Sequence, residues 1–107
     1  MKFWLAGLAV LAVLAGCSPV EANTFEVDAT SFPDAVATLM LCGNEKPLER
    51  RGHFLTLAQP SRCEGEGMVR VRFENGRTTE CRIGYVTNGV GQEFRFRLDR
   101  GGCSPMP

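Results

Sequence analysis

Residues 68–98 read MVRVRFENGRTTECRIGYVTNGVGQEFRFRL, and this stretch decides the predicted fold. Apolar and polar side chains alternate in three segments, at 68–73, 78–86 and 92–98, which is the two-residue period of a strand with one buried face. An Asn-Gly pair lies between each segment and the next, and this pair is a strong signal for a β-hairpin. The stretch therefore predicts a three-stranded antiparallel meander.

The two turns of this meander are expected to differ in length. A two-residue turn at Asn88-Gly89 places Ile83 opposite Phe94, so that apolar side chains meet on one face. The same turn length at Asn75-Gly76 would mix core and solvent-facing side chains, because a one-residue slip inverts every face. We therefore expect a three-residue loop with Gly76 in a bulge, or a four-residue loop, at the first turn.

Upstream of the meander, residues 32–42 are predicted to form a helix. Ser31 is a candidate N-cap, Pro33 suits the first helical turn, and Gly43 suits the C-terminal stop. Apolar residues between these limits recur at helical spacing.

Three further segments, at 25–27, 48–50 and 53–58, are predicted to be short strands. The expected fold class is therefore α+β. One short helix packs on an antiparallel sheet of four or five strands that ends in the meander.

The amino-terminal residues have the form of an export signal. Lys2 precedes an apolar run over 3–16, which is shorter than the roughly 20 residues that a membrane-spanning helix needs. The run ends in Leu14-Ala15-Gly16-Cys17, which resembles the lipobox of bacterial lipoproteins. That resemblance implies cleavage before Cys17 and lipidation of its thiol, with two or more acyl chains giving a firm membrane anchor.

The resemblance also implies a place in the cell. Ser18 follows the lipidated cysteine, which in the enterobacterial pattern implies sorting to the outer membrane, with the domain facing the periplasm or the cell surface. Residues 1–16 are then a signal peptide, 17–24 a lipidated tether and 25–107 one small domain. The alternative is an ordinary secretory signal cut after Ala22, which would release a soluble protein.

The cysteines support an exported, disulfide-bonded domain. Setting Cys17 aside leaves an even number in a chain bound for an oxidising compartment, which predicts two disulfides. The remaining cysteines, for which the sequence leaves all three pairings open, are Cys42, Cys63, Cys81 and Cys103. The sequence has no Cys-x-x-Cys pair of the kind found in zinc and thiol-redox sites, so we expect neither a metal nor a cofactor.

Candidate catalytic residues are few. His53 is the only histidine, and without a nucleophile motif we interpret it as a surface residue. Glu64 and Glu66 lie in a glycine-rich loop, so we interpret them as solvated acids and not as an acid–base pair. The sequence therefore predicts a protein that is not an enzyme. Its formal charge of zero gives no bulk attraction to nucleic acid.

Arginines form the one group of side chains with binding chemistry. Five are expected on one face of the meander, and they are Arg70, Arg72, Arg82, Arg95 and Arg97. Clustered guanidinium groups bind carboxylates or phosphates in a bidentate way. Glutamates are expected on the same face, and they favour the alternative of a solvated surface with ion pairs and no binding role.

The predicted protein is small, exported and disulfide-bonded, and it lacks recognisable catalytic residues. These features predict a non-enzymatic binding or inhibitory module that would contact an envelope protein through its loops 59–67 and 87–91. Two alternatives keep the anchor. One is a structural or assembly accessory of an envelope complex, and the other is a binder of anionic lipid or lipopolysaccharide through the arginine face.

Overall fold

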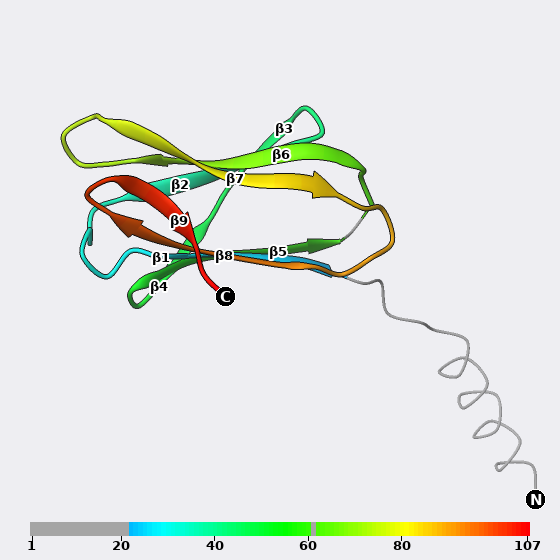
Figure 1. Ribbon diagram of the computed structural model, residues 1–107, viewed down its shortest axis with the longest axis horizontal. Coiled ribbons are helices and arrows are strands. Elements are labelled where there is room, and N and C mark those ends of the chain that lie inside the picture. Colours follow the sequence, from blue (N-terminus) through cyan, green and yellow to red (C-terminus); the bar gives the residue numbers. More distant parts are fainter. Residues whose placement is uncertain (1–21, 61) are drawn as a thin grey trace, which may run out of the picture.

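The computed structural model describes residues 22–60 and 62–107, and every regular element in these ranges is a β-strand (Figure 1). The strands form two sheets that face each other as the layers of a β-sandwich. The five-stranded sheet contains, in spatial order, β4 (Glu49–Arg51), β5 (Phe54–Pro60), β1 (Ala22–Asp28), β8 (Glu93–Asp99) and β9 (Gly102–Pro105). The four-stranded sheet contains β3 (Asn44–Pro47), β2 (Val36–Leu41), β6 (Gly65–Arg72) and β7 (Thr78–Val86).

The predicted helix over 32–42, and with it the α+β class, is wrong. Most of this segment is β2, which pairs with β3 on one side and with β6 on the other. Ala37, Leu39 and Leu41 are buried in it, at the two-residue period of a strand. The same apolar residues also satisfy a helical period, and pairing on both edges decides in favour of the strand.

The first half of the predicted meander is confirmed. β6 and β7 form an antiparallel hairpin, and the Phe73 amide donates to the Arg77 carbonyl oxygen at 2.8 Å. The loop between them therefore has three residues, and Gly76 adopts a φ of 86° in it. This is the expected loop, with the glycine at the position that favours a left-handed backbone.

The second half of the meander is wrong. β8 lies in the opposite sheet from β7, where it runs parallel to β1 and antiparallel to β9. Phe94 therefore lies opposite Phe25 and not opposite Ile83, and the segment containing Asn88 and Gly89 connects the two layers. The other predicted strands, at 25–27, 48–50 and 53–58, correspond to β1, β4 and β5. β1 begins at Ala22, three residues before the predicted domain start at 25.

The core lies between the sheets, and two disulfides link the elements around it. Phe25 is fully buried, and its ring stacks on Phe94 with centroids 5.3 Å apart. The Cys81–Cys103 disulfide joins β7 to β9, one strand from each sheet. The Cys42–Cys63 disulfide joins the β2–β3 turn to the β5–β6 connection. Both predicted disulfides are therefore present, with this pairing out of the three possible ones.

Candidate functional site

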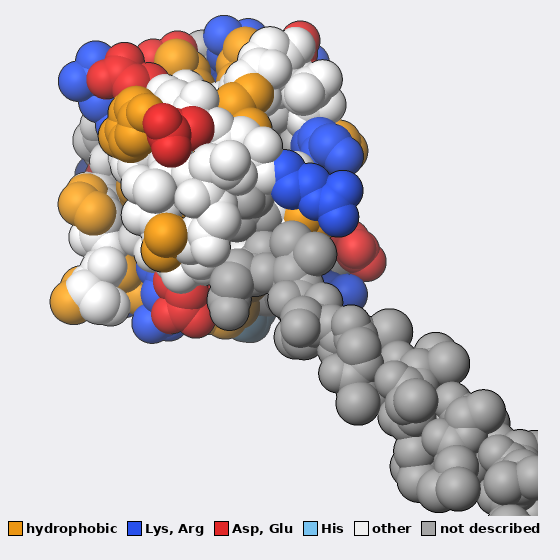
Figure 2. Space-filling model, turned by 90° about the vertical axis from the view of Figure 1, so that its right-hand side faces the viewer, with side chains coloured by type: hydrophobic (Ala, Val, Ile, Leu, Met, Phe, Trp, Pro, Cys, Tyr) orange, Lys and Arg blue, Asp and Glu red, His pale blue; other side chains and the backbone are white. Residues whose placement is uncertain are grey.

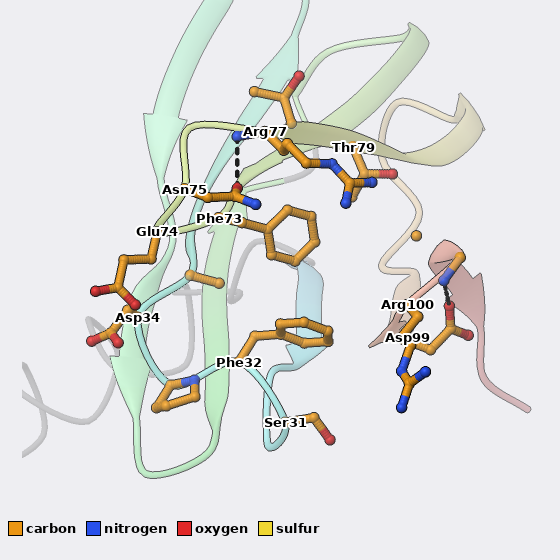
Figure 3. A pocket seen from close by; sticks show the side chains of 15 residues that line it. Ser31, Phe32, Asp34, Phe73, Glu74, Asn75, Arg77, Thr79, Asp99 and Arg100 are labelled. Atoms are coloured by element: carbon orange, nitrogen blue, oxygen red, sulfur yellow. Dashed lines mark hydrogen bonds between the residues drawn. The ribbon is translucent and has the colours of Figure 1, made fainter.

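A cavity of about 740 Å³ opens at one end of the sandwich, where three turns from different parts of the chain meet (Figure 3). These are the β1–β2 connection, the β6–β7 loop and the β8–β9 turn. Its volume lies within the range of about 300–1,000 Å³ that is typical of small-molecule sites. The fold creates this site, because the three turns are far apart in the sequence and meet only at the end of the two stacked sheets.

Two phenylalanines form the apolar part of the cavity. The rings of Phe32 and Phe73 are half-buried, their centroids lie 5.0 Å apart and their planes are tilted by 59°. Phe73 directly follows the last residue of β6, and the Phe32 amide donates to the Ala29 carbonyl oxygen at 2.9 Å, which fixes its turn. Both rings point into the space between the turns (Figure 3). An edge-tilted pair of this kind offers an apolar surface to a ligand.

Side-chain hydrogen bonds hold the two turns that carry arginines. The Arg77 amide donates to Asn75 Oδ1 at 3.0 Å, and the Gly101 amide donates to Asp99 Oδ1 at 2.8 Å. Such local bonds from an Asn or Asp side chain mimic a backbone turn and stabilise it. Asp99 Oδ2 also accepts a hydrogen bond from the Ser104 hydroxyl at 3.3 Å, so both oxygens of this carboxylate are engaged.

The two cavity arginines have no acidic partner. Arg77 and Arg100 are exposed, and no carboxylate in residues 22–60 or 62–107 lies within the 4.0 Å ion-pair distance of either guanidinium. Asp34 and Glu74 project from the far side of the two phenyl rings, away from the guanidinium groups (Figure 3). The arrangement therefore offers an apolar surface with positive charge on one side of it.

The structure does not bring the five arginines of the predicted face together, because they lie on two different sheets. Three are exposed on β6 and β7 of the four-stranded sheet, and two on β8 of the five-stranded sheet. The first group is Arg70, Arg72 and Arg82, and the second is Arg95 and Arg97. The two sheets turn their outer faces in opposite directions, so no surface presents all five guanidinium groups together.

The second group of arginines is engaged in ion pairs. Arg95 Nε lies 3.7 Å from Glu26 Oε2, and Arg97 Nε lies 3.6 Å from Asp28 Oδ2. These acids belong to β1, the parallel neighbour of β8. The outer face of β8 therefore matches the plain salt-bridged surface, and the structure gives no support to anionic-lipid binding through a joint arginine face.

The loops predicted to bind a partner, 59–67 and 87–91, lie at the opposite end of the sandwich from the cavity. This is the end where β1 begins. Ala22, the first residue of β1, pairs with Pro60 in the first loop, and Gly65 in that loop pairs with Val86, which directly precedes the second loop. Seen from this end, acidic, basic and hydrophobic side chains are interspersed (Figure 2). In the same view, basic side chains gather at the right-hand edge.

Glu64 has a structural role that its sequence context did not predict. Its Oε2 accepts a hydrogen bond from the Tyr85 hydroxyl at 2.8 Å, and its Oε1 accepts one from the Asn88 amide at 3.4 Å. The bond to Glu64 raises the pKa of the Tyr85 phenol above its ordinary value, because it favours the protonated form. Glu64 and Glu66 are both exposed, as expected for solvated acids, and Glu64 in addition holds Tyr85 and Asn88 through these hydrogen bonds.

The remaining candidate residues add no further chemistry. His53 is exposed in the turn between β4 and β5, as the sequence predicts. Among the residues described, no group of three or more His, Cys, Asp and Glu side chains is arranged to hold a metal ion. In the same part of the chain, no helix has the length and apolar character needed to cross a bilayer. Cys17 lies outside the described residues.

In comparisons with known proteins, the chain matches no protein family, no curated protein and no solved structure. The candidate site therefore depends on its own geometry. Sequence reasoning missed it, because Phe32 was assigned to a helix and Arg77 and Arg100 lie outside the alternating segments. The one local signal is the spacing of Asn75 before Arg77 and of Asp99 before Gly101, which is typical of side-chain-stabilised turns.

Proposed function

We propose that the protein is a lipoprotein of the bacterial envelope, anchored through Cys17, which binds a ligand or partner at the cavity and catalyses no reaction. One observation carries this proposal: the cavity lies at the end of the sandwich opposite to the start of β1. β1 runs from Ala22 to Asp28, and the connection that follows it contributes Ser31 and Phe32 to the cavity lining. The chain thus enters the domain at one end (Figure 1), and the turns that line the cavity lie at the other.

The length of the tether gives this arrangement a direction. Residues 17–21 span at most roughly 18 Å, at about 3.5 Å per residue. The seven residues of β1 add about 23 Å between its start and the cavity end, at about 3.3 Å per residue. A lipid on Cys17 would therefore keep the start of β1 close to the membrane surface and direct the cavity towards other envelope components.

Burial of Asn23 supports the lipid anchor over a soluble product. Asn23 is 1% exposed, and its Oδ1 accepts a hydrogen bond from the Gln92 amide at 3.1 Å. Cleavage after Ala22 would place a charged amino group on this buried residue. Burying an unpaired charge is costly, and this cost favours the lipid anchor over a cut after Ala22.

The anchor is tested by expressing the full chain and its Cys17→Ser variant and comparing mature masses and membrane association. We expect the wild type to gain the mass of acyl groups on a chain that begins at Cys17, and the variant to lose both the lipid and the membrane association. An unchanged mature mass in the variant would reject the anchor.

The binding role is tested with a photo-crosslinking amino acid placed in the anchored full chain. Glu74 lines the cavity and is exposed, whereas Glu45 is equally exposed on β3 at the other end of the sandwich. We expect adducts with envelope components from position 74 and none of the same mass from position 45. Equal labelling at both positions, or none at position 74, would reject the cavity as the binding site.

A further inference from the structure

We infer that the cavity binds an amphipathic monoanion, an apolar group that carries a single carboxylate, with the apolar group on Phe32 and Phe73 and the carboxylate on the side of the cavity that carries Arg77 and Arg100. This inference rests on the proposed binding function and names the chemical class of its ligand. Three observations carry it: the aromatic pair, the two guanidinium groups in the cavity lining, and the position of the acids that also line it.

The apolar half of the ligand follows from the phenyl rings. Most large apolar side chains of the sandwich are buried in the core, but Phe32 and Phe73 are only partly covered and face the cavity. Filling the cavity with an apolar group would remove the remaining ring surface from water, which is favourable in proportion to the area covered. An entirely polar ligand would leave that surface exposed.

The anionic half follows from the two arginines that line the cavity. Arg95 and Arg97 are paired with acids on β1. Within the described part of the chain Arg77 and Arg100 have no ion pair, which is also true of other exposed arginines, but these two line the cavity. Guanidinium groups bind carboxylates in a planar, bidentate way, so each of the two offers a charge-assisted contact to a carboxylate in the cavity.

The acids around the cavity disfavour a ligand with several negative charges. Asp99 accepts hydrogen bonds from the Gly101 amide and from the Ser104 hydroxyl, and within the described residues it forms no ion pair with Arg77 or Arg100. Asp34 and Glu74 lie beyond the rings, on the other side from the guanidinium groups (Figure 3). Three nearby carboxylates would repel a multiply charged phosphate more strongly than a single carboxylate. A carboxylate next to an apolar group therefore fits best.

The test uses the full-length lipidated protein in phosphatidylcholine nanodiscs and equilibrium dialysis of labelled probes, with empty nanodiscs subtracted. The main probe is N-acetyl-L-phenylalanine. Its matched controls are N-acetyl-L-phenylalanine amide, which keeps the ring and lacks the charge, and N-acetylglycine, which keeps the charge and lacks the ring. We expect the acid with the ring to bind about tenfold more tightly than either control.

Matched variants assign the preference to the two arginines. The Arg77→Gln/Arg100→Gln protein should bind the acid and the amide equally, whereas Arg70→Gln/Arg72→Gln removes the same charge outside the cavity and should keep the preference. Phe32→Leu should weaken both ring-bearing probes alike. Thermal unfolding of each variant shows that it is folded under the dialysis conditions.

The outcomes separate this inference from the function on which it rests. Equal binding of acid and amide by the wild type, or equal loss in both arginine pairs, would overturn the ligand class. If crosslinking from position 74 still captures an envelope component in that case, the binding function stands and only the ligand class fails. If instead the wild type prefers the acid, a peptide ending in phenylalanine and octanoate identify the source, because they present the same chemistry from a protein end and from a fatty acid, respectively. Binding of either probe with the arginine dependence supports the class.

Discussion

Arg97 of β8 lies opposite Asp28 of β1 in a parallel register, and Arg97 Nε is 3.6 Å from Asp28 Oδ2. The other carboxylate oxygen, Asp28 Oδ1, accepts hydrogen bonds from the Thr30 hydroxyl and from the Thr30 amide. These bonds to Thr30, and then the charge of Arg97, hold the pKa of Asp28 below its ordinary value of 3.8. Asp28 therefore links the central strand pair to the turn that leads towards the cavity.

Replacing Asp28 with Asn should destabilise the protein in a pH-dependent way. Because folding lowers the pKa of Asp28, its contribution to the free energy of unfolding is present above the unfolded value of 3.8 and is lost as the pH falls through the lower folded value. In urea unfolding, Asp28→Asn should be less stable than the wild type at about pH 7, and the difference should shrink below about pH 4. The control Glu49→Gln removes an exposed acid whose ion pair with Arg51 is 4.0 Å long, and it should change little. A difference at Asp28 that stays constant with pH would contradict this assignment.

The two disulfides should contribute unequally to stability. They span similar sequence separations, 21 residues for Cys42–Cys63 and 22 for Cys81–Cys103, so the unfolded chain gains a similar entropy of about 3 kcal/mol when either is removed. Cys81 is 1% exposed and lies between the sheets, whereas Cys42 is exposed in a turn. Cys81→Ala/Cys103→Ala should therefore cost about 1 kcal/mol more than Cys42→Asn/Cys63→Ser, because it also leaves a small cavity in the core. Urea unfolding measures both values, and an equal or smaller cost for the buried pair would refute the ranking.

The turn at Cys42 should prefer asparagine once its disulfide is absent. Leu41 pairs with Asn44, and the two residues between them, Cys42 and Gly43, have φ values of 54° and 75°. Two positive φ values are the signature of a type I′ hairpin turn, for which Asn-Gly is the preferred pair. In a Cys63→Ser background, Cys42→Asn should be more stable than Cys42→Ala by about 1 kcal/mol, since alanine is strained in this region. Equal stabilities would mean that the backbone of this turn relaxes when the disulfide is removed.

Alternation in the sequence fixes which face of a strand is buried, but it does not fix the neighbouring strand. Phe94 can pack opposite Ile83 across a hairpin as well as opposite Phe25 in a parallel pair, so the sequence did not predict the partner strand of β8. It did predict the β6–β7 hairpin. The apolar residues of β2 satisfied two periods at once, and only its two neighbours in the sheet resolve the choice.

The cavity was less predictable than the strands, for a topological reason. Phe32, Phe73 and Arg100 lie in three separate turns, and nothing in their local sequence indicates that the turns meet. They meet because β1, β6 and β8 all end on the same side of the sandwich. That fact depends on the parallel pairing of β1 with β8, which alternation alone does not supply.

The contact between Phe32 and Phe73 should be measurable as a coupling energy in a double-mutant cycle. Their rings lie 5.0 Å apart at a tilt of 59°, and such pairs contribute about 0.5–1.5 kcal/mol beyond the area that they bury. Urea unfolding of Phe32→Leu, Phe73→Leu and the double variant should therefore show non-additivity of that size. Phe54 is also half-buried, but it lies at the start of β5 and does not line the cavity, so a cycle of Phe32→Leu with Phe54→Leu should be additive within about 0.5 kcal/mol. If both cycles are additive, the β1–β2 connection and the β6–β7 loop are not held together by this contact. The cavity would then lack the fixed apolar surface on which the proposed ligand depends.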